Sequence, residues 1–482
     1  MEITEYKSEG RYYTPPHIVN AVLSEAYYTA DCTPSCILKK HIIDNSCGDG
    51  AFLKEIVRRY CKEALKNNYT KQQLIYDLQH YIHGIELNPI EHKKAIQTVT
   101  DTVRQFDIQN NQWDIINANA LTTTKYNGKM DYVVGNPPYI RVHNLNDSYD
   151  TIKQFQFAQE GMTDMFIVFY EIGLNMLKPN GILSYITPSS LFHSKAAYKL
   201  RKHLIQNKLL HSVVNLQHYQ PFKATTYTAI FTLQPLQPNR NSDMVYYSIY
   251  NPKQQDRQYV SSLYPNLFYI NGNFYFGTEE ELKQLNNILY TIPDNHLITV
   301  KNGFATLLDS FFIGNYQNFS HTIPIIKAST AKQSYCIFPY DKNGKLLPYN
   351  TLTQDTQLKQ HYKKYETQLK NRSLQNKQEW YGFGRTQAIN DVYKNKYSLS
   401  SIINSQYDLK LTQCRPGTGV YGGLYILSDL SLQQLENILY TDNFFNYIKL
   451  LSKYKSGGYY TFSSNDINIY LHHFLNTIYT VK

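Results

Sequence analysis

Apolar residues in the first half of the chain follow two alternating patterns. Short runs rich in β-branched and aromatic residues, typical of buried strands, are separated by longer segments with the periodicity of a helix face. The expected strands are 41–44, 81–86, 113–118, 130–135, 182–188, 212–216 and 227–233. The expected helices are 18–30, 51–66, 71–79, 164–177 and 196–206. This alternation predicts an α/β domain with a doubly wound sheet.

Polar side chains follow three of these strands at the point where each strand ends. Asp44, Glu86 and Asn119 occupy these positions, and the carboxyl ends of strands form the usual ligand site of an open α/β sheet. One acidic residue suits a cationic amino group, a second can accept from ribose hydroxyls, and an amide oxygen can accept from the amino group of adenine. The turn at 46–50 has two glycines but matches neither G-x-G-x-x-G nor a P-loop. A ligand with a positive end and an adenosine end therefore fits this series, although each residue alone could be an ordinary turn residue.

A fourth strand ends in Asn136, Pro137, Pro138 and Tyr139. The prolines end the strand abruptly, because proline has no N–H for a sheet ladder. An amide side chain, a carbonyl held in a fixed direction and an aromatic face together suit a planar ring that carries an exocyclic NH2 group. A proline turn after a strand is the alternative interpretation.

The start of the first helix has two possible roles. Thr14 is placed to cap this helix, with Pro15 at its first position, where a missing N–H costs nothing. A helix start of this kind can also receive a carboxylate. Capping alone is the alternative to ligand binding.

The chain is too long for a single core. Its 482 residues exceed the roughly 250–300 residues at which cores stop growing, and we expect two domains, at 1–238 and 239–482. The net charge of +10 is spread over both halves and is compatible with a polyanionic partner. The 45 tyrosines can reflect an AT-rich coding sequence rather than a function.

Cysteine spacing and hydropathy argue against metal sites and membrane spans. Cys32 and Cys36 have no matching second pair, so we expect no metal. No signal peptide opens the chain, and no apolar run reaches the roughly 18–20 residues of a membrane span. We therefore expect a cytoplasmic protein with reduced thiols.

The order of the motifs resembles that of the gamma-class S-adenosylmethionine-dependent DNA N6-adenine methyltransferases of type II restriction-modification systems. The resemblance implies a mixed sheet of the class I methyltransferase (Rossmann-like) type, a C-terminal mixed α+β target-recognition domain, and S-adenosyl-L-methionine as cofactor. The cofactor-binding residues that it implies are Thr14, Asp44, Ser46, Cys47, Gly48, Glu86, Asn119, Ala120 and Asn136. Family members usually carry Asp where this chain has Asn119, but an amide oxygen can accept the same hydrogen bond.

Asn136, Pro137, Pro138 and Tyr139 would then be the catalytic residues. If Asn136 Oδ1 and the Pro137 carbonyl accept the two hydrogens of adenine N6, the nitrogen lone pair is aimed at the methyl group. The base must leave the duplex to reach them, and Tyr139 offers a stacking face. The family uses a phenylalanine at the position of Phe222, which we expect to contact the flipped base; a core phenylalanine is the alternative. The chain has no Pro-Cys dipeptide, which argues against methylation of cytosine C5.

The second half contains stretches similar to those of target-recognition domains in the same family. They are 301–306, 325–329, 380–387 and 455–462. Lys327, Arg385 and Lys455 are the expected DNA-binding residues, and Arg385, in a glycine-bracketed loop, would contact phosphate or a guanine edge. The basic segment 358–378 is predicted to form a helix with a basic face. This face either contacts DNA phosphates or is exposed to solvent without a binding role.

These features predict a sequence-specific enzyme that methylates adenine N6 in double-stranded DNA and protects it from a cognate restriction endonuclease. Two alternatives stay open: a methyltransferase of another amino group, in an RNA base or a protein glutamine, and an inactive DNA-recognition subunit. Only nine residues precede Gly10, so we expect any endonuclease to be a separate chain. We expect a monomer in the bacterial cytoplasm, associated with the nucleoid.

Overall fold

The computed structural model describes residues 13–29, 37–109, 112–141, 149–160, 162–222, 226–235, 243–293, 298–374, 376 and 379–480. The chain divides into two compact units, Met1–Lys283 and Gln284–Lys482. Cys32, Cys36 and Lys377, which entered the sequence predictions, lie outside the described residues.

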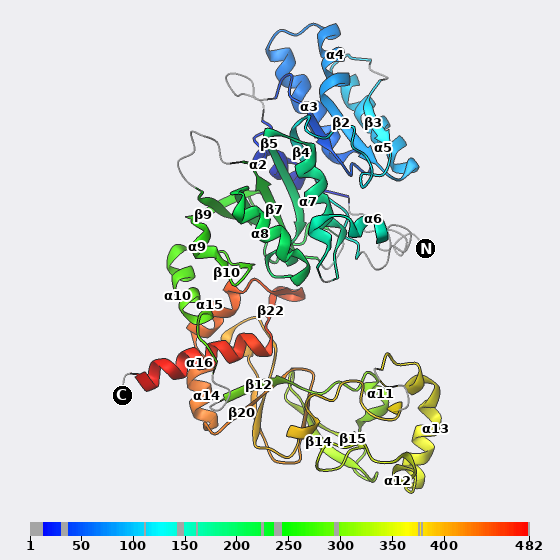
Figure 1. Ribbon diagram of the computed structural model, residues 1–482, viewed down its shortest axis with the longest axis vertical. Coiled ribbons are helices and arrows are strands. Elements are labelled where there is room, and N and C mark those ends of the chain that lie inside the picture. Colours follow the sequence, from blue (N-terminus) through cyan, green and yellow to red (C-terminus); the bar gives the residue numbers. More distant parts are fainter. Residues whose placement is uncertain are drawn as a thin grey trace. The chain divides into compact units, whose positions relative to one another are not determined.

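A nine-stranded sheet forms the centre of the first unit (Figure 1). Its strands are β1 (Ile42–Asp44), β2 (Ile82–Glu86), β3 (Asp114–Asn117), β4 (Met130–Gly135), β5 (Leu177–Pro188), β6 (Leu210–Asn215), β7 (Thr228–Leu233), β8 (Val245–Asn251) and β9 (Asp256–Leu263). Their order across the sheet is β3-β2-β1-β4-β5-β7-β6-β8-β9. The pairs from β3 to β5 are parallel, whereas β7 runs antiparallel to β5 and β6. The predicted mixed, doubly wound sheet is confirmed.

The strand order places a ligand crevice at the middle of this sheet. β1 has β2 on one side and β4 on the other, and the chain changes sides between β3 and β4. Ligands of open α/β sheets bind at the carboxyl ends of the strands where the order reverses. All three predicted polar strand ends and the N-P-P-Y tetrapeptide follow β1 to β4.

Helices cover both faces of the sheet. Apolar residues of α2 and α3 share one buried cluster with Tyr132 and Val134 of β4. Leu183 of β5 is in register with Val133 and so points to the other face, where Gly173 of α7 packs so closely that a Cβ there would lie 2.6 Å from Leu183. The helices are α2 (Pro16–Glu25), α3 (Ala51–Lys66), α4 (Lys71–Tyr81), α5 (Pro89–Arg104), α6 (Tyr149–Lys153), α7 (Met165–Met176), α8 (Tyr198–Gln206) and α9 (Pro265–Phe268).

The compact units divide later than the boundary expected after residue 238. β8 and β9 account for the difference, because β8 pairs in parallel with β6 and continues the first sheet. A short hairpin of β10 (Tyr269–Ile270) and β11 (Asn273–Phe274) follows, and α10 (Glu279–Leu289) contains the point of division.

The described part of the second unit combines three small sheets with helices. The strand orders are β12-β20-β16-β18, β13-β15-β14-β19 and β17-β22-β21. The strands are β12 (Ile298–Asn302), β13 (Ile313–Gly314), β14 (Thr322–Lys327), β15 (Lys332–Ile337), β16 (Lys396–Leu399), β17 (Ile402–Ile403), β18 (Leu411–Cys414), β19 (Gly419–Tyr421), β20 (Leu424–Ser428), β21 (Tyr454–Lys455) and β22 (Tyr459–Thr461). The helices are α11 (Asp309–Phe312), α12 (Tyr349–Leu352), α13 (Thr356–Lys370), α14 (Leu432–Leu439), α15 (Asp442–Leu450) and α16 (Ser464–Thr480). The predicted mixed α+β composition is confirmed, and no helix in the described part of the chain is long and apolar enough to cross a membrane.

Candidate active site

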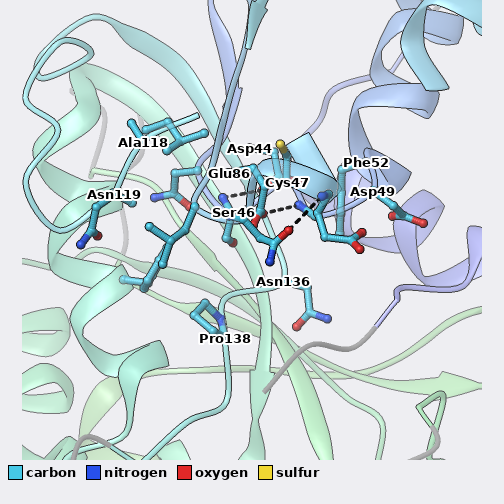
Figure 2. A pocket seen from close by; sticks show the side chains of 18 of the residues that line it. Asp44, Ser46, Cys47, Asp49, Phe52, Glu86, Ala118, Asn119, Asn136 and Pro138 are labelled. Carbon is cyan, nitrogen blue, oxygen red and sulfur yellow. Dashed lines mark hydrogen bonds between the residues drawn. The ribbon is translucent and has the colours of Figure 1, made fainter. Parts of the chain in front are cut away.

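A cavity of about 460 Å³ opens at the carboxyl ends of β1 to β4. Figure 2 shows Asp44, Glu86, Asn119 and Asn136 around it, each at or shortly after the carboxyl end of a different strand. The predicted residues that line the cavity are Thr14, Asp44, Ser46, Cys47, Gly48, Glu86, Asn119, Ala120, Asn136 and Pro138. The fold thus brings all nine predicted cofactor residues together, and their roles stay predictions.

Two backbone N–H groups fix the Glu86 carboxylate. Gly48 N–H donates to Oε2 at 2.8 Å and Asn88 N–H donates to Oε1 at 2.8 Å. Gly48 has a φ of +53°, a conformation that favours glycine. Each carboxylate oxygen has a further lone pair. Glu86 can therefore accept from two vicinal hydroxyls and keep both backbone hydrogen bonds.

The Asp44 carboxyl is buried next to this turn, with 1% of its surface exposed. Its Oδ1 accepts from Ser46 N–H at 3.1 Å. Burial raises the pKa of Asp44 to about 8, and a bound cation would lower that pKa again. The buried Ser46 hydroxyl has no hydrogen-bond partner among the described residues. The buried Asp44 carboxyl could pair with the ammonium group of an amino acid, and the Ser46 hydroxyl could donate to its carboxylate.

Asn119 starts a tight turn at the end of β3. Its Oδ1 accepts from Leu121 N–H at 3.0 Å, and its backbone carbonyl accepts from the Thr123 hydroxyl at 2.8 Å. Leu87, which follows Glu86, also lines the cavity and is 66% exposed. An apolar surface beside amide and carboxylate acceptors suits the adenosine part of a ligand.

The Asn136 amide is oriented by Thr14. Asn136 Nδ2 donates to Thr14 Oγ1 at 3.1 Å, which fixes the rotation of the amide and hence the direction of its carbonyl oxygen. The predicted capping role of Thr14 is wrong: α2 starts at Pro16, Pro15 occupies the capping position, and no side chain caps the helix. Thr14 precedes the capping position by one residue, and its hydroxyl accepts from Asn136.

Tyr139 and Phe222 are in contact beside Asn136. Their ring centroids lie 6.3 Å apart with planes at 85°, an edge-to-face arrangement. The Tyr139 hydroxyl donates to the Ile186 carbonyl at 3.1 Å. Phe222 is 7% exposed and belongs to the buried cluster under α2 and α3. The structure therefore brings the two predicted base-contacting rings together, with Phe222 also part of the core.

Residues 36–222 match the family of the Eco57I restriction-modification methylases. The matched segment extends from just before β1 to Phe222, in the loop that follows β6. The type II methyltransferase M.BstVI of Geobacillus stearothermophilus is 25% identical over 78% of this chain and 74% of its own length. RM.Eco57I of Escherichia coli, a type II restriction enzyme and methyltransferase, is 23% identical over 63% of this chain and 35% of its own length. The predicted resemblance to type II methyltransferases is confirmed.

The fold has a solved counterpart. The type IIL restriction-modification enzyme MmeI, determined in complex with DNA, matches with a TM-score of 0.63 at 12% identity. The match covers 93% of this chain and 63% of the MmeI chain. Both units of this chain therefore have the folds seen in that enzyme, and the predicted fold class is confirmed.

The sequence analysis missed several residues that line the cavity. Asn88 accepts from Ile90 N–H at the start of α5, and an Asn-Pro pair ahead of a helical pattern could have indicated this cap. Leu87 could have been found as an apolar residue directly after an acidic strand end. Met165 and Phe169 of α7 also line the cavity, but they lie within a uniformly apolar stretch that gave no signal.

The three predicted DNA-binding residues of the second unit lie on different elements. Lys327 ends β14 in register with Tyr421 of β19. Arg385 pairs with Ala305 through an isolated bridge, and Arg385 N–H donates to the Ala305 carbonyl at 2.9 Å. Lys455 lies in β21 of a different sheet. All three side chains are exposed.

The predicted basic helix over 358–378 is shorter than expected, and one of its basic residues is buried. The helix α13 ends at Lys370, and Arg372 beyond it is only 8% exposed. Its guanidinium donates to the carbonyls of Thr306, Trp380 and Gly382. Arg372 is therefore a structural residue that ties the Arg385 loop to its neighbours, because a buried guanidinium needs acceptors on every side.

Proposed function

We propose that the chain transfers a methyl group from S-adenosyl-L-methionine to N6 of an adenine in double-stranded DNA. One observation carries the proposal: Asn136 shares a single cavity with Asp44, Glu86 and Asn119. The acceptor suited to an aromatic amine thus lies beside side chains suited to a cationic ligand that ends in adenosine.

Different cavity residues would bind different parts of the cofactor. Asp44 would balance its ammonium group and the Ser46 hydroxyl would bind its carboxylate, because one is a buried acid and the other a buried hydroxyl. Glu86 would accept from the ribose hydroxyls, and Asn119 and Leu87 would contact the adenine. When bound, the cofactor supplies an electrophilic methyl group.

Catalysis by the chain itself rests on orientation. Asn136 Oδ1 and the Pro137 carbonyl accept the hydrogens of N6, which draws the nitrogen lone pair out of the ring and makes it a better nucleophile. Thr14 keeps the Asn136 amide in the required rotation through the 3.1 Å hydrogen bond. Contributions of this kind can reach about 7–11 kcal/mol when reacting groups are held close to attack geometry.

Tyr139 and Phe222 would hold the flipped base. Tyr139 offers a ring face, and Phe222 meets that ring edge-on, so the base would stack on one ring and touch the edge of the other. Stacking of this kind contributes about 1–3 kcal/mol per base, which offsets part of the cost of unpairing.

We assign target recognition to the second unit, Gln284–Lys482. Lys327, Arg385 and Lys455 are exposed cations on its strands and loops, and contacts from such residues to phosphates or guanine edges position a protein on DNA. We further propose that the enzyme acts as a monomer at the bacterial nucleoid and protects sites cut by a separate endonuclease.

The test is expression in a methylation-deficient bacterial host, followed by sequencing of the host genome for N6-methyladenine. We expect one short motif to be modified at nearly every occurrence. Purified protein incubated with cofactor and unmethylated genomic DNA should modify the same motif. Absence of any modified motif in both experiments would falsify the proposal.

A further inference from the structure

A hydrogen bond between His17 and Tyr219 joins two segments of the first unit that lie far apart in sequence. His17 Nε2 and the Tyr219 hydroxyl are 2.8 Å apart. His17 belongs to α2, whereas Tyr219 lies in the loop between β6 and β7. Both side chains are half-buried, so the bond is partly shielded from competing water.

Tyr250 of β8 supports this pair from one side. The rings of Tyr219 and Tyr250 are stacked at 5.6 Å with planes at 21°, and the His17 ring lies 6.3 Å from Tyr250 at 29°. The Tyr250 hydroxyl is buried without a hydrogen-bond partner among the described residues. The stack therefore positions the rings, while the single polar link runs between His17 and Tyr219.

The loop up to Tyr219 is held firmly on the sheet. Tyr219 N–H donates to the Leu216 carbonyl at 2.9 Å, and Gln217 N–H donates to Asn215 Oδ1 at 2.9 Å. Gln217 has a φ of +49°, which marks a tight turn. Phe222 follows three residues after Tyr219, so the position of the Tyr219 ring limits where Phe222 can lie.

The two linked segments contact the first and the last residue of the tetrapeptide 136–139. On the side of α2, Thr14 accepts from the Asn136 amide. On the side of the loop, Phe222 contacts Tyr139 edge-on. The His17–Tyr219 bond therefore links the segment that contacts Asn136 to the segment that contacts Tyr139.

We propose that the His17–Tyr219 hydrogen bond is a latch that positions Phe222 against Tyr139 and so sets the shape of the target-base site. The inference rests on the proposed function, because it concerns the base that the enzyme methylates. His17 and Tyr219 are positioning residues: they act on the base through Phe222 and Asn136 and do not bind the cofactor.

The test compares two tyrosine-to-phenylalanine variants from the same stack. Tyr219→Phe removes the hydroxyl of the latch, whereas Tyr250→Phe removes a hydroxyl that has no hydrogen-bond partner in the described part of the chain. We expect hydrogen exchange of the backbone amides at 216–222 to be about fivefold faster in Tyr219→Phe, the change that corresponds to one ordinary hydrogen bond, and unchanged in Tyr250→Phe.

Methyl incorporation into unmethylated genomic DNA gives the functional readout. We expect kcat to fall at least threefold in Tyr219→Phe, with KM for the cofactor within twofold of the parent protein and Tyr250→Phe at full activity. His17→Gln, which keeps a hydrogen-bonding group facing the Tyr219 hydroxyl, should retain more activity than His17→Ala.

The two readouts separate failure of the latch from failure of the proposed function. Equal exchange and equal kcat in both tyrosine variants overturn the latch. A rise in the cofactor KM that matches the fall in kcat also overturns it, because a general loss of structure then explains the variant. If the parent protein methylates no DNA while Tyr219→Phe exchanges faster, the latch exists but its role in positioning a base is refuted together with the proposed function.

Discussion

Asp44 illustrates at the residue scale how a binding site can be built at the expense of stability. Its carboxyl is buried and receives one backbone hydrogen bond, from Ser46. Burial raises its pKa to about 8 from the 3.8 of an exposed aspartate. The folded protein therefore retains a proton that the unfolded chain has lost, and the charged form that a cationic ligand needs is disfavoured until that ligand arrives.

Replacing Asp44 by Asn should reveal this cost as a function of pH. A raised carboxyl pKa gives stability that is complete below about pH 4 and is lost as the pH rises through about 8. We expect thermal unfolding of Asp44→Asn and the parent protein to diverge between pH 5 and 9, with the variant gaining at least about 1 kcal/mol relative to the parent at the upper end. Parallel stability curves would contradict this account. Cofactor binding, followed by calorimetry, should weaken in the variant.

The role of Asn136 is tested by Asn136→Ala. Loss of a positioned acceptor should reduce methyl transfer at least about a hundredfold, while cofactor binding survives because the acidic and hydroxyl groups of the cavity stay in place. Radiolabelled methyl incorporation and calorimetric cofactor titration measure the two effects. Asn127→Ala, at an exposed turn residue, is the matched control. Loss of cofactor binding with unchanged residual turnover would assign Asn136 a different role.

At the scale of elements, the site depends on the close approach of β4 to β1. The two strands pair in parallel, with Asp44 in register with Val134. Gly135, the next residue, has a φ of +151°, and a Cβ there would lie 2.7 Å from Asp44 Oδ1. Glycine at the end of β4 thus leaves room for the carboxylate that precedes the glycine turn.

Gly135→Ala should therefore damage the site more than an ordinary glycine substitution. We expect a loss of about 1–3 kcal/mol from backbone strain together with at least tenfold weaker cofactor binding, since Asp44 must move. Gly128→Ala is the control, because Gly128 also has a positive φ, of +67°, but has open space around its Cβ position. Chemical denaturation and cofactor titration measure both variants. Equal cofactor affinity in the two variants would show that the space beside Asp44 does not matter.

At the scale of the whole molecule, two arginines of the second unit lie in different surroundings, and we propose a folding role for Arg372 and a DNA-binding role for Arg385. Arg372 is buried and donates to four carbonyls, whereas Arg385, in the loop that it supports, is exposed. Both were part of the predicted basic surface, and no sequence pattern distinguished the buried arginine from the exposed one.

Arg372→Ala should lower stability by about 2–4 kcal/mol, because the carbonyls lose their donor. Arg385→Ala should leave stability unchanged and weaken DNA binding by about 1–3 kcal/mol. If Arg385 contacts phosphate, the salt dependence of binding also becomes shallower by about one ion. Denaturation and DNA titrations at several salt concentrations test this. An Arg385→Ala protein with unchanged DNA affinity at every salt concentration would remove this residue from the interface.

Local sequence determined the elements and the chemical inventory of this protein. The strands β1 to β4 lie within about two residues of their predicted positions, because buried strands bounded by polar turns are encoded over a few neighbouring residues. Asp44, Glu86, Asn119 and Asn136 could be singled out for the same reason: each lies at or shortly after the end of such a strand.

Only the tertiary structure decided which side chains meet. The partner of Thr14 is Asn136 and that of His17 is Tyr219, contacts between residues more than a hundred positions apart that no local pattern encodes. Burial, which separates Arg372 from Arg385 and raises the pKa of Asp44, arises only when distant segments exclude water. The sequence therefore specifies the groups that this protein carries, and the packing of the chain specifies which of them are oriented for chemistry and which hold the fold.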